Sequence, residues 1–143
     1  MTADTTPNAW EEALIAEMRA NDGQVLAGPL AGHPLLLLTV TGARSGQPRR
    51  SILTYSRDGD AYVVAGTAGG SPTDPAWVAN VRANPEVVVE VGNETFPALA
   101  TVVDGPERDA LWERHVQALP WFADYPAQTG RLIPMIRLTR RQG

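Results

Sequence analysis

Two hairpin signatures constrain the fold of this chain more than any other feature of its sequence. In each, a glycine beside a small polar residue separates two runs rich in apolar and β-branched residues, and such turns join antiparallel strands directly. The runs and their turns are Ser51–Arg57 and Ala61–Gly66 around Asp58-Gly59, and Val87–Val91 and Thr95–Val103 around Gly92-Asn93. An antiparallel sheet is therefore predicted, rather than the regular strand–helix alternation of a parallel one.

The remaining periodic segments supply two further strands and three helices. The apolar runs Pro34–Thr41 and Leu132–Thr139 are predicted strands. Pro97 indicates that its own strand lies at a sheet edge or carries a bulge. The predicted helices are Ala9–Ala20, a short one opened by Asp74-Pro75 and ended before Asn84-Pro85, and one from Asp104-Gly105-Pro106 to about Leu119. About six strands with flanking helices predict an α+β antiparallel barrel.

The length of 143 residues predicts a single domain, with an N-terminal helix and loop over residues 1–30 and the barrel over 31–143. No apolar run approaches the ~20 residues of a membrane-spanning helix. The first residues have neither a basic region nor an apolar core, so we expect no secretory signal and a cytoplasmic location. The polar face of the first helix is mostly acidic, so peripheral association with a membrane is not indicated.

The composition excludes several kinds of chemistry. All twelve positive side chains are arginine, because the sequence contains no lysine, and it contains no cysteine either. Schiff-base catalysis, a phosphate-binding lysine and thiolate chemistry are thereby unavailable. The two histidines, His33 and His115, have no spacing typical of metal ligands, so no metal site is predicted. Any redox chemistry is expected to depend on a bound organic cofactor.

One loop concentrates positive charge in a chain whose formal net charge is -4. The stretch T-G-A-R-S-G-Q-P-R-R-S, residues 41–51, holds Arg44, Arg49 and Arg50. Guanidinium groups match phosphate and carboxylate geometry, and glycines let backbone amides approach an anion. The alternative is a solvated turn whose arginines maintain solubility. The clustering within an acidic chain favours an anion-binding loop.

Two other segments are candidates for a ligand site. The turn G-T-A-G-G, residues 66–70, precedes a helix and offers backbone amides and the hydroxyl of Thr67 to a ligand, but it matches no nucleotide-binding fingerprint. The alternative is a flexible loop. Trp77 and the predicted loop rich in aromatics and proline, with Trp121, Phe122 and Tyr125, belong either to the core or to the wall of an apolar pocket. His115 is interpreted as a core histidine, and His33 as a loop residue.

In this order, three segments resemble the deazaflavin-dependent nitroreductase family of actinobacterial enzymes. They are L-L-L-L-T-V-T-G-A-R-S-G-Q-P-R-R, D-G-D-A-Y-V-V-A-G-T-A-G-G and D-P-A-W-V-A-N-V-R-A-N-P-E-V-V-V. The resemblance extends from about Leu35 to Leu138. It implies a split β-barrel of the FMN-binding type and the use of reduced coenzyme F420, an 8-hydroxy-5-deazaflavin with a phosphate and an acidic oligoglutamate tail.

The resemblance also implies roles for individual residues. Arg44 and Arg49 stand where the family has basic residues for the tail, and Ser45 and Gly46 complete that turn. Arg50, followed by Ser51, lies at a position that the family does not keep basic. The residues implied at the deazaflavin ring are Thr67, Ala68, Gly69, Gly70, Ala76 and Trp77.

The substrate side departs from the pattern of the family. Relatives carry tyrosines before the last strand, and Leu119 and Phe122 replace two of them here, while Tyr125 keeps a hydroxyl. Thr54 stands where some relatives have tyrosine. The implied pocket comprises Thr54, Trp121, Phe122 and Tyr125, with Thr67 and Tyr125 as candidate hydrogen-bond donors in catalysis.

The function expected from this resemblance is hydride transfer from reduced F420 to a small flat apolar acceptor, such as a quinone, an activated alkene or enone, or a nitro compound. Two alternatives stay open: an FMN-dependent oxidoreductase of the same architecture, and a non-catalytic F420-binding or storage protein. Nucleic acid is not expected as a partner, because the basic cluster is one short loop in an acidic chain. A homodimer is compatible with the fold, because split barrels often pair.

Overall fold

The computed structural model describes residues 9–26, 28, 31–67 and 73–141. Its seven strands are β1 (Leu35–Thr41), β2 (Pro48–Thr54), β3 (Ser56–Asp58), β4 (Ala61–Ala65), β5 (Glu86–Val91), β6 (Glu94–Val103) and β7 (Met135–Arg140). Its helices are α1 (Ala9–Ala20), α2 (Ala76–Ala83), α3 (Gly105–Ala118), the 3-10 helix η3 (Pro120–Asp124) and α4 (Tyr125–Thr129). None of these helices is both long enough and apolar enough to cross a membrane.

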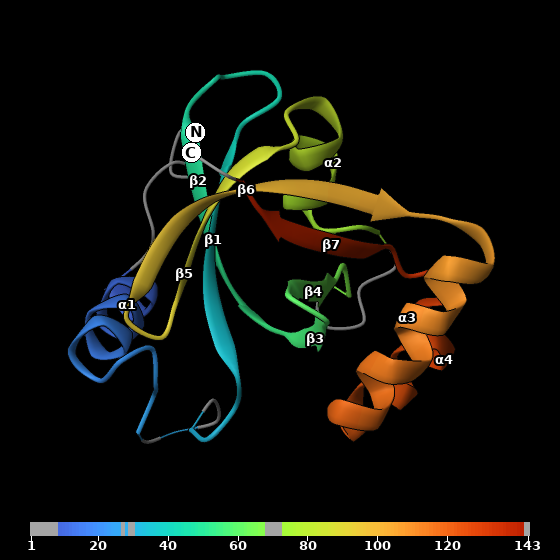
Figure 1. The fold of residues 1–143 in the computed structure, drawn as a ribbon, viewed down its shortest axis with the longest axis horizontal. Helices are drawn as coiled ribbons and strands as arrows, with labels where there is room; N and C mark the ends of the chain where they lie inside the picture. The colour runs from blue at the N-terminus through green and yellow to red at the C-terminus, as the bar shows by residue number, and fades with distance from the viewer. Residues whose placement is uncertain (1–8, 27, 29–30, 68–72, 142–143) are drawn as a thin grey trace.

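The strands form one antiparallel sheet in the order β2-β1-β5-β6-β7-β4-β3 (Figure 1). The two edge strands of this sheet, β2 and β3, are separated in the chain by Tyr55 alone. One residue spans only about 3.3 Å of extended chain, so the two edges must meet at this corner. The sheet therefore curls into a barrel that is closed beside Tyr55 and open further along its edges, which confirms the predicted α+β split barrel.

The corner at Tyr55 corrects the prediction of a single strand over Ser51–Arg57. The β2 part pairs with β1, from Leu35 opposite Thr54 to Thr41 opposite Pro48, and only β3 pairs with β4. The strand is broken because its two halves hydrogen-bond to opposite edges of the sheet. This break accounts for seven strands instead of about six.

Pro97 lies in an interior strand, which corrects the expectation of an edge or a bulge. It is opposite Val88 of β5, and its carbonyl accepts a hydrogen bond from the Arg141 amide 2.9 Å away. The N–H and C=O of an extended residue point to the same side, so the missing donor of Pro97 faces β7. Pairing with β7 begins one residue later, at Ala98 opposite Arg140. The proline thus stands where the pairing with β7 ends, and its carbonyl accepts the last hydrogen bond on that side.

The core occupies both faces of the sheet near β4. Val64 belongs to the main cluster inside the barrel, whereas Val63 and Ala65 pack under α3 and η3. Because side chains alternate between the two faces of a strand, the continuous apolar run of β4 is buried on both sides. The inner cluster consists of Leu36, Leu38, Val40, Val64, Trp77, Val78, Val81, Val87, Val89, Val91, Phe96, Ala98, Ala100, Ile136 and Leu138.

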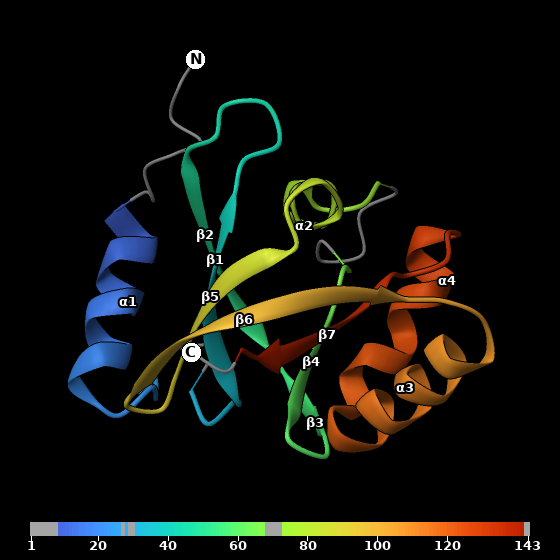
Figure 2. The same cartoon turned by 45° about the horizontal axis from the view of Figure 1, so that its top comes forward.

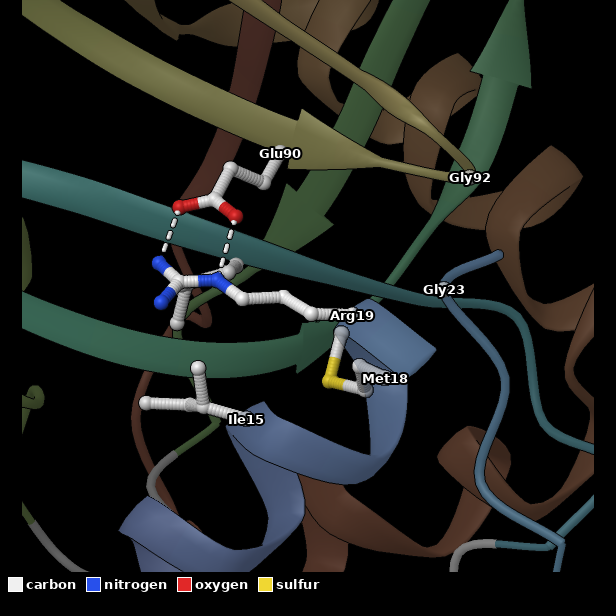
Figure 3. A pocket seen from close by; sticks show the side chains of 7 residues that line it. Ile15, Met18, Arg19, Gly23, Glu90 and Gly92 are labelled. Atoms are coloured by element: carbon white, nitrogen blue, oxygen red, sulfur yellow. Dashed lines mark hydrogen bonds and ion pairs between the residues drawn. The ribbon is translucent and has the colours of Figure 1, made fainter. Parts of the chain in front are cut away.

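The helix α1 flanks the outer face of β1, β2 and β5, at the opposite end of the molecule from α3 and α4 (Figure 2). Leu14 and Met18 pack with Val25, Leu35 and the partly buried Ile52. Figure 3 shows the Arg19 guanidinium facing the Glu90 carboxylate of β5, at 3.0 and 2.9 Å. The hollow beside this pair measures only about 20 Å³, too small for a cofactor.

The aromatic segment after α3 is helical, whereas the sequence analysis expects a loop. Pro120 and Pro126 each stand in the first turn of a short helix, η3 and α4, where a missing N–H costs no hydrogen bond. Gly130 ends α4 in the left-handed conformation with φ of 66°. The 3-10 helix η3 packs against α3, and α4 packs against η3.

Candidate functional site

A cleft of about 380 Å³ opens between β2 and the end of β4, where the barrel is split. This volume lies within the range of small-molecule sites. It is lined by Leu35, Ile52, Leu53, Thr54, Ala65, Thr67, Pro75, Trp77, Trp121, Phe122 and Tyr125. The structure thus brings Thr54, Thr67, Trp77 and the three aromatic residues of η3 and α4 to one site, although they come from five segments.

One wall of the cleft is a cluster of aromatic rings. Phe122 is 5% exposed and lies 5.7 Å from the Trp121 ring and 5.2 Å from the Tyr125 ring, centroid to centroid. Trp121 is 39% exposed, and its other neighbour is the His33 ring at 4.7 Å. Phe122 is therefore the buried centre of this wall, and Trp121 lies at its solvent-exposed edge.

His115 supports this wall from behind. It is fully buried, its ring centre lies 4.6 Å from that of Phe122, and its Nδ1 is 2.6 Å from Ser56 Oγ. Its Nε2 has no hydrogen-bond partner among the described residues, so it is a core histidine that is only half satisfied. Burial lowers the pKa of His115 from 6.5 to about 4, which keeps the ring neutral at pH 7.

The opposite wall is the start of α2. Trp77 is 7% exposed and belongs to the inner core cluster, yet it also lines the cleft. The two interpretations left open by the sequence are therefore both correct for this side chain. Ala76 beside it is exposed. Asp74 does not cap α2 as predicted; its carboxylate pairs instead with Arg131 at 2.6 Å.

The arginine-rich loop between β1 and β2 is an ordered turn. The Gly42 amide donates to the Gln47 carbonyl at 2.8 Å, and the Gly46 amide donates to the Gly42 carbonyl at 3.0 Å. A Cβ on Gly42 would lie 2.6 Å from Ser45 Oγ and 3.0 Å from Arg49 Nε, so a larger residue there would displace these two side chains. Ser45 Oγ accepts from the Gln47 amide at 3.1 Å and from Arg49 Nη2 at 3.5 Å.

Two asparagines of the α2 segment connect this loop to the cleft, and the sequence analysis assigns them no role. Asn80 Oδ1 accepts a hydrogen bond from the Ala43 amide at 3.0 Å, and Asn84 Nδ2 donates to the Thr41 carbonyl at 3.5 Å. Asn80 lies within α2 and Asn84 caps its end, and their place in the stretch D-P-A-W-V-A-N-V-R-A-N-P is the sequence signal that could have pointed to them. α2 thus begins at the cleft and ends at the basic loop.

The arginines differ in what neutralises them. Ion pairs with carboxylates of the described residues are formed by Arg19, Arg50, Arg108, Arg114, Arg131, Arg137, Arg140 and Arg141, among others. Arg50 pairs with Glu12 of α1 at 3.5 Å. Successive side chains of a strand alternate between its faces, so Arg50 points to the α1 face, as Ile52 does, and away from Arg49 and Ser51. Arg44 is exposed and has no ion pair within the ranges that the structure describes.

The turn after β4 is described only in part. Ala68, Gly69 and Gly70, which the sequence analysis assigns to the cofactor ring, lie outside the described residues. Thr67 lines the cleft, and its carbonyl accepts a hydrogen bond from Arg131 Nη2 at 3.0 Å. Arg131 was not predicted as a site residue, because its contacts are about 65 positions away in the chain.

Comparisons with known proteins agree with this arrangement. The model of the F420H(2)-dependent quinone reductase family matches residues 11–140. An F420H(2)-dependent quinone reductase of Mycobacterium tuberculosis is 41% identical over 126 residues, 86% of this chain and 85% of that protein. A second relative from M. tuberculosis, called a putative F420H(2)-dependent quinone reductase, is 33% identical over 76% of this chain and 91% of its own length.

Solved structures give the same result. The F420H2-dependent reductase FDR-A is 38% identical, with a TM-score of 0.68 over 73% of this chain and 93% of its own. A structure described as a domain-swapped dimer is 34% identical, with a TM-score of 0.70 over 90% of this chain and 94% of its own. A FAD-binding protein of Mesorhizobium loti, 16% identical with a TM-score of 0.57 over 91% of this chain and 88% of its own, shares the fold alone. The chain belongs to the F420H(2)-dependent quinone reductase family.

Proposed function

We propose that this chain binds reduced coenzyme F420 with its ring in the cleft and its acidic tail at the basic loop, and reduces a flat apolar acceptor. Membership of the family implies coenzyme F420 as the cofactor. The observation that carries the proposal is that one short helix, α2, joins an aromatic cleft at its start to an arginine loop at its end.

The residues present fit such a cofactor. A planar ring needs flat apolar walls, and Trp77, Trp121 and Phe122 supply them. A chain of phosphate and carboxylates needs positive charge that other carboxylates have not already neutralised, and Arg44 is exposed without an ion pair in the described part of the chain. Arg49 and Ser51 point to the same face of β2 as Leu53, which lines the cleft.

When bound, the reduced deazaflavin supplies the hydride, so the protein needs no redox-active side chain. The aromatic walls hold the acceptor flat and exclude water from the reacting atoms. Thr67 and Tyr125 line the cleft, and we expect their hydroxyls to donate a hydrogen bond to an acceptor oxygen that gains negative charge. The proton that completes the reduction comes through these hydroxyls or from solvent.

Quinones are the first acceptors to test, because the named relatives are quinone reductases. Activated alkenes, enones and nitro compounds are also flat and electrophilic, and they belong to the same proposal. Leu119 does not line the cleft; it is 2% exposed and packs in the cluster under α3. The hydroxyls available to an acceptor therefore come from Thr54, Thr67 and Tyr125.

The test is a fluorescence titration with F420 beside FMN, on the wild type, Arg44→Ala, Arg49→Ala and the control Arg140→Ala. Each loop variant is expected to weaken F420 binding about tenfold, the cost of a charge-assisted hydrogen bond, and to weaken FMN binding less, because FMN lacks the acidic tail. Arg140 pairs with Glu94 at the turn between β5 and β6, the end of β5 away from the loop, so its variant should bind like the wild type. Unchanged F420 binding in both loop variants would remove the basic loop from the proposal.

Turnover separates the enzyme from a storage protein. Oxidation of reduced F420 is followed by its absorbance in the presence of a simple naphthoquinone, an enone and a nitroaromatic compound. Tight binding without turnover of any acceptor would favour the non-catalytic alternative, and a preference for FMN would favour the flavin alternative. A homodimer also stays a proposal, supported by the relative described as a domain-swapped dimer, and light scattering of the purified protein tests it.

A further inference from the structure

Arg131 joins the two walls of the cleft through a single guanidinium group. Its Nη1 donates to the Gly66 carbonyl at 3.0 Å and to Asp74 Oδ1 at 2.6 Å, and its Nη2 donates to the Thr67 carbonyl at 3.0 Å. Gly66 and Thr67 follow β4, whereas Asp74 directly precedes Pro75 and α2. The three acceptors therefore belong to opposite sides of the site.

The backbone of Arg131 is itself held in place. Thr129 Oγ1 accepts from the Arg131 amide at 3.1 Å and donates to the Arg131 carbonyl at 3.2 Å. Ile133 lies two residues after Arg131, and its carbonyl accepts hydrogen bonds from Arg108 Nε at 3.1 Å and Arg108 Nη2 at 2.7 Å. The segment that carries Arg131 is thus fixed at both ends, so the guanidinium is directed before any ligand binds.

The junction that Arg131 spans is tightly packed. The Gly66 amide donates to the Pro134 carbonyl at 2.9 Å, and a Cβ on Gly66 would lie 2.8 Å from Val78 Cγ2 of α2. Only 16% of the Arg131 side chain is exposed, against 48% for Arg141 in a surface pair. Low exposure strengthens charge-assisted hydrogen bonds, whereas exposed pairs contribute little.

We infer that Arg131 is a positioning residue that sets the distance between Thr67 and the start of α2, and through them the geometry of the cleft. A lysine would keep the charge, but its ammonium group cannot reproduce the planar guanidinium, whose two Nη atoms donate to acceptors on both sides of the cleft. The consequence for hydride transfer depends on the proposed function. The consequence for the structure of the cleft does not.

The first test uses the cofactor-free protein and hydrogen–deuterium exchange. In Arg131→Lys, exchange is expected to rise at least about tenfold at the amides of Gly66 and Val78, which bond to Pro134 and Pro75, because their segments lose a common tie. The strands β5 and β6 should keep wild-type exchange. The matched control Arg140→Lys, which alters an exposed pair with Glu94, should leave Gly66 and Val78 unchanged. Unchanged exchange in Arg131→Lys would overturn the inference.

The second test measures function, if the wild type binds F420 and turns over. Arg131→Ala is expected to lower kcat about tenfold or more with a smaller change in KM, because the walls still exist but are misplaced. Guanidinium at low millimolar concentration should restore part of kcat in Arg131→Ala and none in Arg140→Ala. Absence of rescue together with normal exchange in Arg131→Lys would leave no positioning role. Failure of the wild type to bind F420 would instead overturn the proposed function and leave the exchange result standing.

Discussion

At the level of single residues, the arginines of this chain divide by what they bind. Arg108 and Arg131 donate to backbone carbonyls and stabilise the segment before β7, Arg50 binds α1, and Arg44 faces solvent. Because the sequence contains no lysine, arginine serves both as the structural donor to backbone carbonyls and as the candidate anion ligand. Exposure and pairing therefore identify the candidate ligand-binding arginine better than residue type does.

At the level of single residues, we predict that the hydroxyl of Thr67 contributes to turnover. It lines the cleft, and it forms no hydrogen bond with another described residue, so it is available to a ligand. Thr67→Val keeps the shape and removes the donor, and kcat is expected to fall about tenfold. Thr67→Ser should retain most activity. Steady-state oxidation of reduced F420 with a quinone measures both variants, and equal rates for Val and Ser would exclude a role for the hydroxyl.

At the level of elements, α1 is held by apolar packing more than by its ion pair. Met18 is 5% exposed and packs with Leu14, Val25 and Leu35, whereas the Arg19 side chain is 55% exposed. Burial of a methionine contributes several times more than an exposed ion pair. Leu35 also lines the cleft, so α1 supports the floor of the site from the outer face rather than covering its opening.

Substitutions in α1 test this order of contributions. Met18→Ala is expected to lower the free energy of unfolding by about 2–4 kcal/mol, through lost burial and the cavity that remains. Arg19→Ala should cost less than about 1 kcal/mol. Urea denaturation curves measure both. A larger effect for Arg19→Ala would show that the bidentate contact to Glu90, rather than the apolar face, attaches the helix.

At the scale of the whole molecule, the pH dependence of stability should carry the signature of His115, which joins α3 to β3 through Ser56. Its pKa falls from 6.5 to about 4 in the folded protein, because burial disfavours the charged ring. The unfolded chain therefore binds a proton before the folded one does as the pH falls. The stability associated with the neutral ring is complete above pH 6.5 and is lost between pH 6.5 and 4.

The size of this loss is about 3 kcal/mol at pH 4, since each unit of pKa difference corresponds to about 1.4 kcal/mol. His115→Gln removes the titrating ring, so the stability difference between wild type and variant should shrink by this amount as the pH falls from 7 to 4. Thermal or urea unfolding across this range measures it. A difference that is constant with pH would show that the ring is protonated as easily in the fold as outside it.

Much of this molecule was encoded locally and could be predicted from the sequence. The hairpins, the helices α1 and α3 and the basic loop follow from φ preferences, apolar periodicity and charge, which act over a few residues. The structure brings the candidate residues Thr54, Thr67, Trp77, Phe122 and Tyr125 to one cleft, and their roles there stay predictions. The order of the motifs, and the family resemblance that this order carries, had indicated them.

Only the tertiary structure decided where the barrel opens and what holds the site together. Asn80 reaches Ala43 across 37 positions, and Arg131 reaches Gly66 across 65, so no local pattern indicates either contact. The break at Tyr55 likewise depends on which edge each half of the strand finds, because strand pairing is decided by partners distant in the chain. The sequence alone thus determined the kinds of elements and the chemistry they carry, and the closing of the sheet determined the cleft in which they meet.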